Sequence, residues 1–217
     1  ISACLVGSEM CIRDRVILFA LGLGLLCSPS YLRRQSIPHE GEYYGLLLLS
    51  ALGMMLMASA TNLMTVFVGL EVLSLALYVL CAIVPGRRQS QEAGMKYFIL
   101  SSFASAFLLY GMAMIYGSTG ATNLDSIRAF LDAHAYHLGS GFGPLLVVGL
   151  GLLAVGFSFK VSAVPFQAWT PDVYTGAPTP VTAFMSVGTK VAAFVALARV
   201  FLFALQGVFT LWTPVFW

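Results

Sequence analysis

Apolar runs of membrane-spanning length follow one another along this chain, and short polar breaks separate them. A helix that crosses the ~30 Å hydrocarbon layer needs about 20 predominantly apolar residues. Complete spans are predicted over residues 43–60, 63–84, 95–116, 144–169 and 181–207. Because 59% of the residues are hydrophobic and 9% are charged, the chain lacks the charge, usually about 25%, of a soluble domain. The sequence therefore predicts an all-α polytopic membrane protein.

The two ends of the chain differ from this pattern. Residues 16–42 are predicted to be a truncated span, apolar over 16–28, followed by a polar loop. Residues 1–15 (ISACLVGSEMCIRDR) place charges directly before the apolar run but have no cleavage site after it, unlike a signal peptide. The tract SEMCIRDR resembles translated sequencing-adapter read-through, so we expect residues 1–15 to be a foreign leader. Residues 208–217 are expected to begin the next loop or span.

The charged loops predict an orientation in the membrane. Two polar loops contain most of the basic loop residues: Arg33, Arg34, Arg87, Arg88 and Lys96. Because two spans separate these loops, both loops lie on the same side of the membrane. The opposite polar stretch has Arg128 against Asp125 and Asp132. By the positive-inside tendency, the arginine-rich side is predicted to be cytoplasmic.

A surface helix is predicted within the polar stretch 117–143. Its apolar residues share one face, and Asn123 stands where an N-cap belongs: Leu124, Ile127, Leu131 and Leu138. His134 and His137 have a spacing that could suit a metal, but no third ligand is evident. We therefore expect an ordinary interfacial role for both histidines.

Several functional classes find no support in the sequence. The net charge is +2, and no basic cluster with interleaved aromatic residues indicates nucleic-acid binding. The chain has no dinucleotide fingerprint, cysteine quartet or haem signature, so neither a cofactor nor a metal is predicted in this chain. The cysteines form no C-x-x-C pair and are expected to be isolated thiols: Cys4, Cys11, Cys27 and Cys81.

Three ionisable residues, Glu71, Lys160 and Lys190, stand inside apolar runs. Each costs about 2.5–3.5 kcal/mol at the centre of a membrane helix. With a rise of 1.5 Å per residue, Glu71 lies ~14 Å below one surface and Lys190 lies ~14 Å below the other. Lys160 is also central, so three spans are predicted to bring titratable groups to the same depth, where they serve proton transfer.

A helix break is predicted immediately after Lys160. Pro165 has no backbone N–H and clashes with the preceding helical turn, and it pushes Val164 away from helical dihedral angles. Broken helices at membrane depth recur at the ion sites of transporters, where protein or water satisfies the freed groups. We therefore expect freed carbonyls and the hydroxyls of Ser158 and Ser162 to support a hydrated station at Lys160.

The segment from Lys160 to Lys190 (KVSAVPFQAWTPDVYTGAPTPVTAFMSVGTK) closely resembles subunit N of bacterial NADH-quinone oxidoreductase, respiratory complex I. Relatives include chloroplast and mitochondrial counterparts and the multi-subunit sodium/proton antiporters. The stretches VGLEVLSLALYVL and KYFILSSFASAFLLYG extend the likeness over residues 43–207. The tracts TPDVY and GAPTPV favour subunit N over its sister subunits.

The resemblance implies a fold and a role for each residue. The family fold has two inverted five-span repeats, and residues 43–207 would form one repeat, an antiporter-like bundle with a broken seventh span. Glu71 matches the conserved glutamate of the fifth span, Lys160 the lysine of the broken span, and Lys190 the lysine that passes protons onward. Gln167 and Thr175 depart from the family's histidine and glutamate, which puts proton uptake through those two side chains in doubt.

The function implied is proton translocation in the bacterial inner membrane. NAD, flavin, iron–sulfur clusters and quinone would belong to partner subunits, whose redox chemistry drives Glu71 away from Lys160 and releases a proton toward Lys190. One alternative is a subunit of a cation/proton antiporter with the same residues. Another is a structural scaffold in which Glu71 and a lysine form a buried ion pair that locks two helices.

Overall fold

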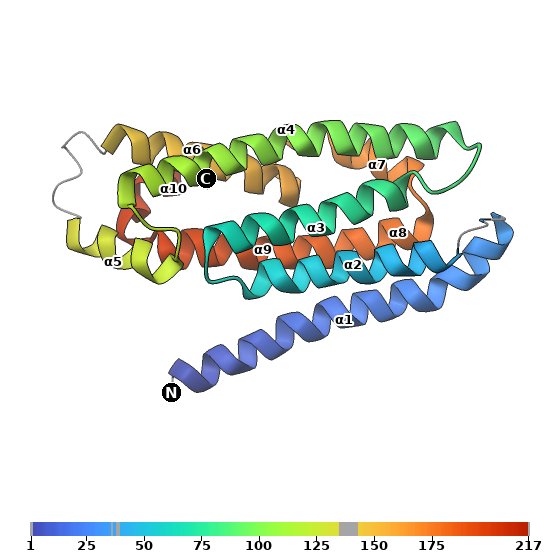
Figure 1. Cartoon of the computed structure of the whole chain (residues 1–217), viewed down its shortest axis with the longest axis horizontal. Helices are drawn as coiled ribbons and strands as arrows, with labels where there is room; N and C mark the ends of the chain where they lie inside the picture. The colour runs from blue at the N-terminus through green and yellow to red at the C-terminus, as the bar shows by residue number, and fades with distance from the viewer. Residues whose placement is uncertain (1, 36, 38–39, 135–142, 217) are drawn as a thin grey trace.

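The computed structural model describes residues 2–35, 37, 40–134 and 143–216, and helices dominate them (Figure 1). The side chains of residues 2–11 and 215 are not described. The elements, in chain order, are α1 (Ser2–Arg34), α2 (Glu40–Ser59), α3 (Leu63–Cys81), α4 (Arg88–Thr119), α5 (Leu124–His134), α6 (Gly143–Val161), α7 (Trp169–Gly176), α8 (Thr179–Phe184), η2 (Met185–Thr189), α9 (Lys190–Ala198), η3 (Arg199–Ala204), η4 (Gln206–Val208) and α10 (Phe209–Phe216).

Within the described residues, six helical stretches are long and apolar enough to cross a membrane: Ile12–Arg34, Glu40–Ser59, Leu63–Cys81, Arg88–Thr119, Gly143–Val161 and Thr179–Ala204. The last is one rod formed by α8, η2, α9 and η3, in which two π-helical segments flank α9. The long helices run roughly side by side (Figure 1). The predicted all-helical multi-span class is confirmed.

Two helices are longer than the sequence predicts. Helix α1 continues through Pro29 to Arg34, so the prediction of a short apolar segment over 16–28 and a loop over 29–42 is wrong in its bounds. Helix α4 begins at Arg88, ahead of the predicted residue 95. In both cases polar residues extend a helix beyond its apolar part, because a helix satisfies backbone groups that lipid cannot.

The path of the chain groups the predicted loops at two ends of the bundle (Figure 1). The α1–α2 and α3–α4 connections lie at one end, next to the arginine pairs at the end of α1 (Arg33 and Arg34) and at the start of α4 (Arg87 and Arg88). Helix α5, which carries Arg128, lies at the opposite end. This arrangement agrees with the two-sided distribution of charge, and the cytoplasmic assignment of the arginine-rich end stays a prediction.

Helix α5 confirms the predicted amphipathic segment. Its apolar residues Leu124, Ile127 and Leu131 are buried, and the side chain of Asn123 accepts a hydrogen bond from the backbone N–H of Asp125 at 2.9 Å. The predicted continuation through His137 and Leu138 lies outside the described residues.

Helices α2 and α3 approach each other closely because glycines line their contact. A Cβ atom at Gly53 would lie 2.4 Å from the backbone nitrogen of Leu73, and one at Gly69 would lie 2.6 Å from that of Met57. Small residues allow such backbone contact between membrane helices, where packing rather than water exclusion drives association. The pair holds Glu71 of α3 at a fixed depth and rotation in the bundle.

Replacing Gly69 by alanine is expected to separate α2 from α3 and destabilise the protein by about 1–3 kcal/mol, the usual cost of overpacking. Thermal unfolding of the purified protein in detergent measures the change. Gly151→Ala is the matched control, since a Cβ there meets no atom within 4 Å. Equal melting temperatures for the two variants would contradict the close approach.

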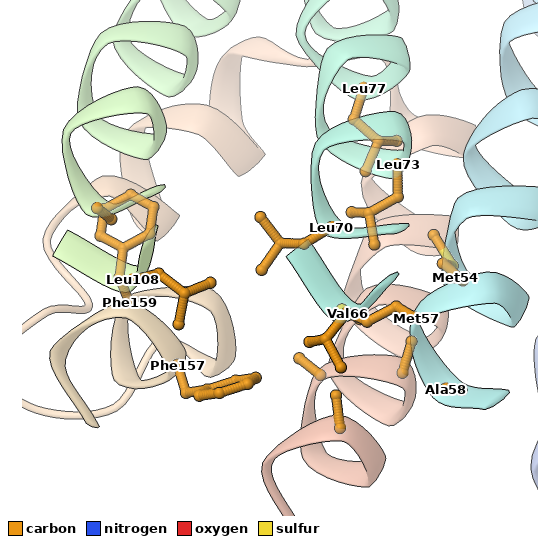
Figure 2. Close-up of a cluster of buried hydrophobic side chains, with 14 of the residues drawn as sticks. Met54, Met57, Ala58, Val66, Leu70, Leu73, Leu77, Leu108, Phe157 and Phe159 are labelled. Carbon is orange, nitrogen blue, oxygen red and sulfur yellow. The ribbon is translucent and has the colours of Figure 1, made fainter. Parts of the chain in front are cut away.

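Apolar side chains fill the space between the helix pairs (Figure 2). Leu70 of α3 points toward Leu108 of α4 and Phe159 of α6, and all three are buried (Figure 2). This layer lies next to the ionisable residues in sequence, since Leu70 precedes Glu71 and Phe159 precedes Lys160. The charged groups are therefore set into an apolar core rather than into a polar surface.

Candidate functional site

The site forms where helix α6 stops inside the bundle. Ser162 has a left-handed backbone (φ 61°), and its N–H donates to the carbonyl of Phe159 at 3.2 Å. The N–H of Ala163 donates to the carbonyl of Ser158 at 2.8 Å. These two bonds form a Schellman motif, which ends a helix after a left-handed residue. The break falls directly after Lys160, where the sequence places it, and three residues ahead of Pro165.

Side chains from other elements also donate hydrogen bonds to carbonyls at this helix end. The indole nitrogen of Trp169 donates to the carbonyl of Phe159 at 3.0 Å. The Nζ of Lys190 donates to the carbonyl of Lys160 at 3.2 Å and to the hydroxyl of Ser162. A cation is favoured at a helix C-terminus, where the exposed carbonyls carry partial negative charge. Lys190 therefore lies at the end of the helix that carries Lys160.

Lys160 is 2% exposed and meets neutral partners. Its Nζ donates to Ser74 Oγ of α3 at 2.6 Å and to Tyr97 Oη of α4 at 3.2 Å. The hydroxyl of Ser74 in turn donates to the carbonyl of Leu70. Three helices thus supply the surroundings of one buried amine, whose hydrogen bonds do not depend on a carboxylate.

Glu71 is half-buried on α3 and accepts a hydrogen bond from Ser105 Oγ of α4 at 2.5 Å. Glu71 takes part in none of the ion pairs found among the described residues. Those pairs are Arg13–Asp14, Lys96–Glu92, Lys96–Asp172 and Arg128–Asp132. The expected contact between Glu71 and Lys160 is therefore not a salt bridge in this conformation.

A narrow crevice is lined by Lys160 and by Ser105, the hydrogen-bond partner of Glu71. Ser101, Ser105, Leu108 and Lys160 are among its lining residues, and it is too narrow to hold a water molecule. A carboxylate and a buried amine that are not in direct contact can still influence each other through space. A small movement of the helices would change that influence without breaking a direct bond.

Aromatic rings cover the site on the side of helix α7. The ring of Trp169 stacks on Tyr97 with centroids 4.8 Å apart and on Phe159 with centroids 5.3 Å apart. The Nζ of Lys190 lies 5.1 Å from the centroid of the same indole ring. Trp169 therefore contacts the surroundings of both lysines.

The structure brings together most of the residues singled out in the sequence. Lys160, Lys190 and Ser162 share one network, while Glu71 is bonded to Ser105 outside it. Ser158 contributes its backbone carbonyl to the helix end. Pro165 is exposed, and its peptide bond with Val164 is cis.

Sequence reasoning missed four side chains of this site: Ser74, Tyr97, Ser105 and Trp169. Ser74 had a detectable signal, because it follows Glu71 by three positions and so shares its helix face. Tyr97 and Trp169 had none, since an aromatic residue in an apolar run is typical of ordinary packing.

Other expected positions lie away from the lysines. Gln167 and Thr175 are exposed. The ring of His134 stacks on Phe130, with its Nδ1 2.9 Å from the Phe130 carbonyl. Cys81 is buried and Cys27 exposed, both as free thiols. Over the described parts of the chain, no group of three or more His, Cys, Asp or Glu is placed to hold a metal ion.

The fold and site define a class, the multi-pass membrane proteins whose broken helix carries buried charged groups, an arrangement found at the ion sites of transporters. Residues 60–216 match the family described as NADH:quinone oxidoreductase/Mrp antiporter, transmembrane. The chain belongs to this family.

The chain is also similar to curated proteins named NADH-quinone oxidoreductase subunit N. The chain is 46% identical over 202 residues to NADH-quinone oxidoreductase subunit N of Trichlorobacter lovleyi, covering 93% of this chain and 40% of the relative. It is 51% identical over 179 residues to the subunit of that name from Mycobacteroides abscessus, covering 82% and 32%. The chain therefore spans well under half the length of these relatives.

Solved structures show the same fold. A chain of respiratory complex I from Thermus thermophilus matches with 41% identity and a TM-score of 0.68, over 87% of this chain and 39% of that one. A chain of the Mrp complex from a Dietzia species matches with 24% identity and a TM-score of 0.70, over 90% and 36%. The similarity to the Mrp chain shows a shared fold and nothing further.

Proposed function

We propose that this chain is a proton-translocating part of subunit N of a bacterial NADH-quinone oxidoreductase. The observation that carries the proposal is the arrangement at the end of helix α6. There Lys160 is buried and bonded to the neutral hydroxyls of Ser74 and Tyr97, and Lys190 donates a hydrogen bond to the backbone carbonyl of Lys160. Buried amines are costly in a membrane and are retained where they serve an ion pathway.

The proposed mechanism is electrostatic. Burial disfavours a charged amine, and a nearby carboxylate favours it. When Glu71 is close, Lys160 holds its proton. When a movement of α3 or α4 takes the carboxylate away, Lys160 releases the proton toward Lys190 through water that enters the helix break. Lys190 is already at the end of α6, so the transfer needs no large displacement of its backbone.

The rest of the pathway would belong to other parts of the complex. The proposal places the redox cofactors NAD, flavin, iron–sulfur clusters and quinone in partner subunits, and places this chain in the bacterial inner membrane among other membrane subunits. Redox energy would then reach Glu71 as movement or as a change of charge in neighbouring helices.

A cation/proton antiporter subunit is the second candidate function, because the family includes the Mrp antiporters. The sequence likeness favours the oxidoreductase, with 41% identity to the complex I chain against 24% to the Mrp chain. The same lysines would act in both, and the coupling partner would differ.

The scaffold alternative requires an ion pair between Glu71 and a lysine. The hydrogen bonds of Glu71 with Ser105 and of Lys160 with Ser74 and Tyr97 do not favour it. Under the scaffold alternative Lys190 would have no task beyond capping a helix.

Replacing Lys190 by methionine tests the proposal. We expect NADH-driven proton pumping in membrane vesicles to fall, because Lys160 then has no acceptor for its proton. The full-length subunit in the assembled complex carries the change, and Ser186→Ala, an exposed position on the same rod, serves as the matched control. Pumping equal to that of the control would favour the scaffold.

A further inference from the structure

We propose that protons reach Lys160 from a crevice between helices α4 and α7, with the hydroxyl of Tyr97 as the last relay. This inference rests on the proposed function and names a route and a residue that the proposed function leaves open. The route begins at a surface opening, runs between α4 and α7 and ends at the hydrogen bond between Tyr97 and Lys160.

The opening is a crevice of about 190 Å³ lined by Gln89, Glu92, Ala93, Lys96, Asp172, Thr175 and Gly176. Lys96 Nζ lies 2.8 Å from both Glu92 Oε1 and Asp172 Oδ2, and all three side chains are exposed. Exposed ion pairs are worth about 1 kcal/mol or less, so this one can open readily. Two carboxylates and an amine at the mouth can exchange protons with the water outside.

Two rows of residues, one on a face of α4 and one on a face of α7, lead inward from the crevice. On α4, Tyr97 follows the lining residue Ala93 by four positions, and so lies one turn deeper on the same face. On α7, Trp169 is seven positions before the lining residue Gly176, again on one face. The two rows meet where the rings of Tyr97 and Trp169 stack, with an angle of 8° between the ring planes.

Tyr97 connects this stack to the proposed station. The side chain is 1% exposed, and its Oη accepts a hydrogen bond from Lys160 Nζ at 3.2 Å. The ring of Tyr97 stacks on Trp169, while its hydroxyl faces the amine of Lys160. Tyr97 therefore contacts both the indole ring of Trp169 and the amine of Lys160.

A further phenol next to the stack has an unsatisfied hydroxyl. The hydroxyl of Tyr174 is buried and has no hydrogen-bond partner in the described part of the chain. Tyr174 packs edge-on against Trp169. Burial raises the pKa of Tyr174 to about 12, so its phenol stays protonated and needs a partner. Buried polar groups without protein partners are commonly bonded to water.

The relay step conserves protons. A protonated water on the crevice side gives a proton to the oxygen of Tyr97, while the proton already on that oxygen moves to the neutral amine of Lys160. The tyrosine ends the step as the neutral phenol it began as, the water loses its charge, and Lys160 becomes an ammonium group. Reorientation of the phenol O–H resets the relay.

Tyr97→Phe removes the relay oxygen and keeps the ring that stacks on Trp169. In the assembled complex with the full-length subunit, we expect its NADH-driven pumping to fall toward the level of Lys160→Met. Tyr110→Phe, on the exposed face of the same helix, is the matched control. If Lys160→Met stops pumping through this subunit while Tyr97→Phe equals the control, the relay is wrong and the proposed function stands. If Lys160→Met itself pumps normally, the proposed function fails.

A separate readout distinguishes a relay from a packing role. Incorporation of a fluorinated tyrosine at position 97, which keeps the ring but has a more acidic phenol, should shift the pH profile of pumping. A purely structural Tyr97 predicts an unshifted profile, which would overturn the relay.

The mouth of the route is tested by blocking it. Thr175→Cys is labelled with a bulky, water-soluble thiol reagent, and pumping by the same variant is compared before and after labelling. The unsubstituted protein treated with the reagent controls for the native cysteines. A loss confined to labelled Thr175→Cys supports the crevice as the mouth, and unchanged pumping after complete labelling excludes it.

Discussion

Substitution of Lys160 by methionine is expected to abolish proton transfer through this chain and to leave the bundle folded. A positioned proton-transfer group contributes about a hundredfold or more to its step, and methionine cannot bind a proton at this place. Pumping driven by NADH in vesicles, at matched amounts of assembled complex, measures the loss.

The fold should tolerate this change because two opposing contributions nearly cancel. Removal of an amine from the membrane interior recovers about 2.5–3.5 kcal/mol. Against this, the variant loses the bonds to Ser74 and Tyr97, each worth about 1.5–3 kcal/mol for a charged donor. A shift in stability within about 2 kcal/mol is expected in thermal unfolding. A variant that no longer assembles would show that Lys160 is needed for the fold, against our assignment.

The second large effect is expected for Glu71→Gln. The amide oxygen can still accept the hydrogen bond from Ser105 Oγ, so the local structure should persist while the negative charge is lost. An electrostatic interaction of about 1.4 kcal/mol with Lys160 corresponds to a factor of ten in rate, and we expect pumping to fall by about that factor.

Glu71→Asp is the matched control for charge, and Ser105→Ala is the control for the hydrogen bond. If the charge matters, the aspartate variant retains more pumping than the glutamine variant, and Ser105→Ala affects pumping less than Glu71→Gln. Equal pumping by the aspartate and glutamine variants would contradict an electrostatic role of Glu71.

The apolar runs and the buried charges could be predicted from the sequence because lipid leaves few alternatives. A run of about 20 apolar residues has to be a helix in hydrocarbon, and an ionisable residue in its middle has to face other helices. The bounds were less predictable. Helix α1 crosses Pro29 and α4 starts at Arg88, since polar residues at the membrane surface can extend a helix or leave it.

The helix break was predictable in position but not in cause. Pro165 signals an interruption in the sequence, whereas the helix ends at a Schellman motif with left-handed Ser162. Such motifs commonly use glycine, so a serine there gives no signal. The tertiary contacts of Lys190, Trp169 and Thr170 with this segment select the conformation, and they join residues up to 30 positions apart.

The partners of Lys160 were not predictable for a related reason. Ser74 and Tyr97 lie 86 and 63 positions away in the sequence, and their contact with the amine depends on the rotation of three helices. Glu71 was expected to pair with a lysine, and its acceptance of a bond from Ser105 shows that α4 rather than α6 supplies its nearest partner.

The most direct test of the central claim is the number of protons moved per NADH oxidised, compared between the unsubstituted complex and Lys160→Met at equal assembly. We expect a lower ratio for Lys160→Met, because transfer through this subunit stops while other membrane subunits can continue. An unchanged ratio would exclude proton transfer through Lys160 and leave the buried lysines of this chain as structural groups.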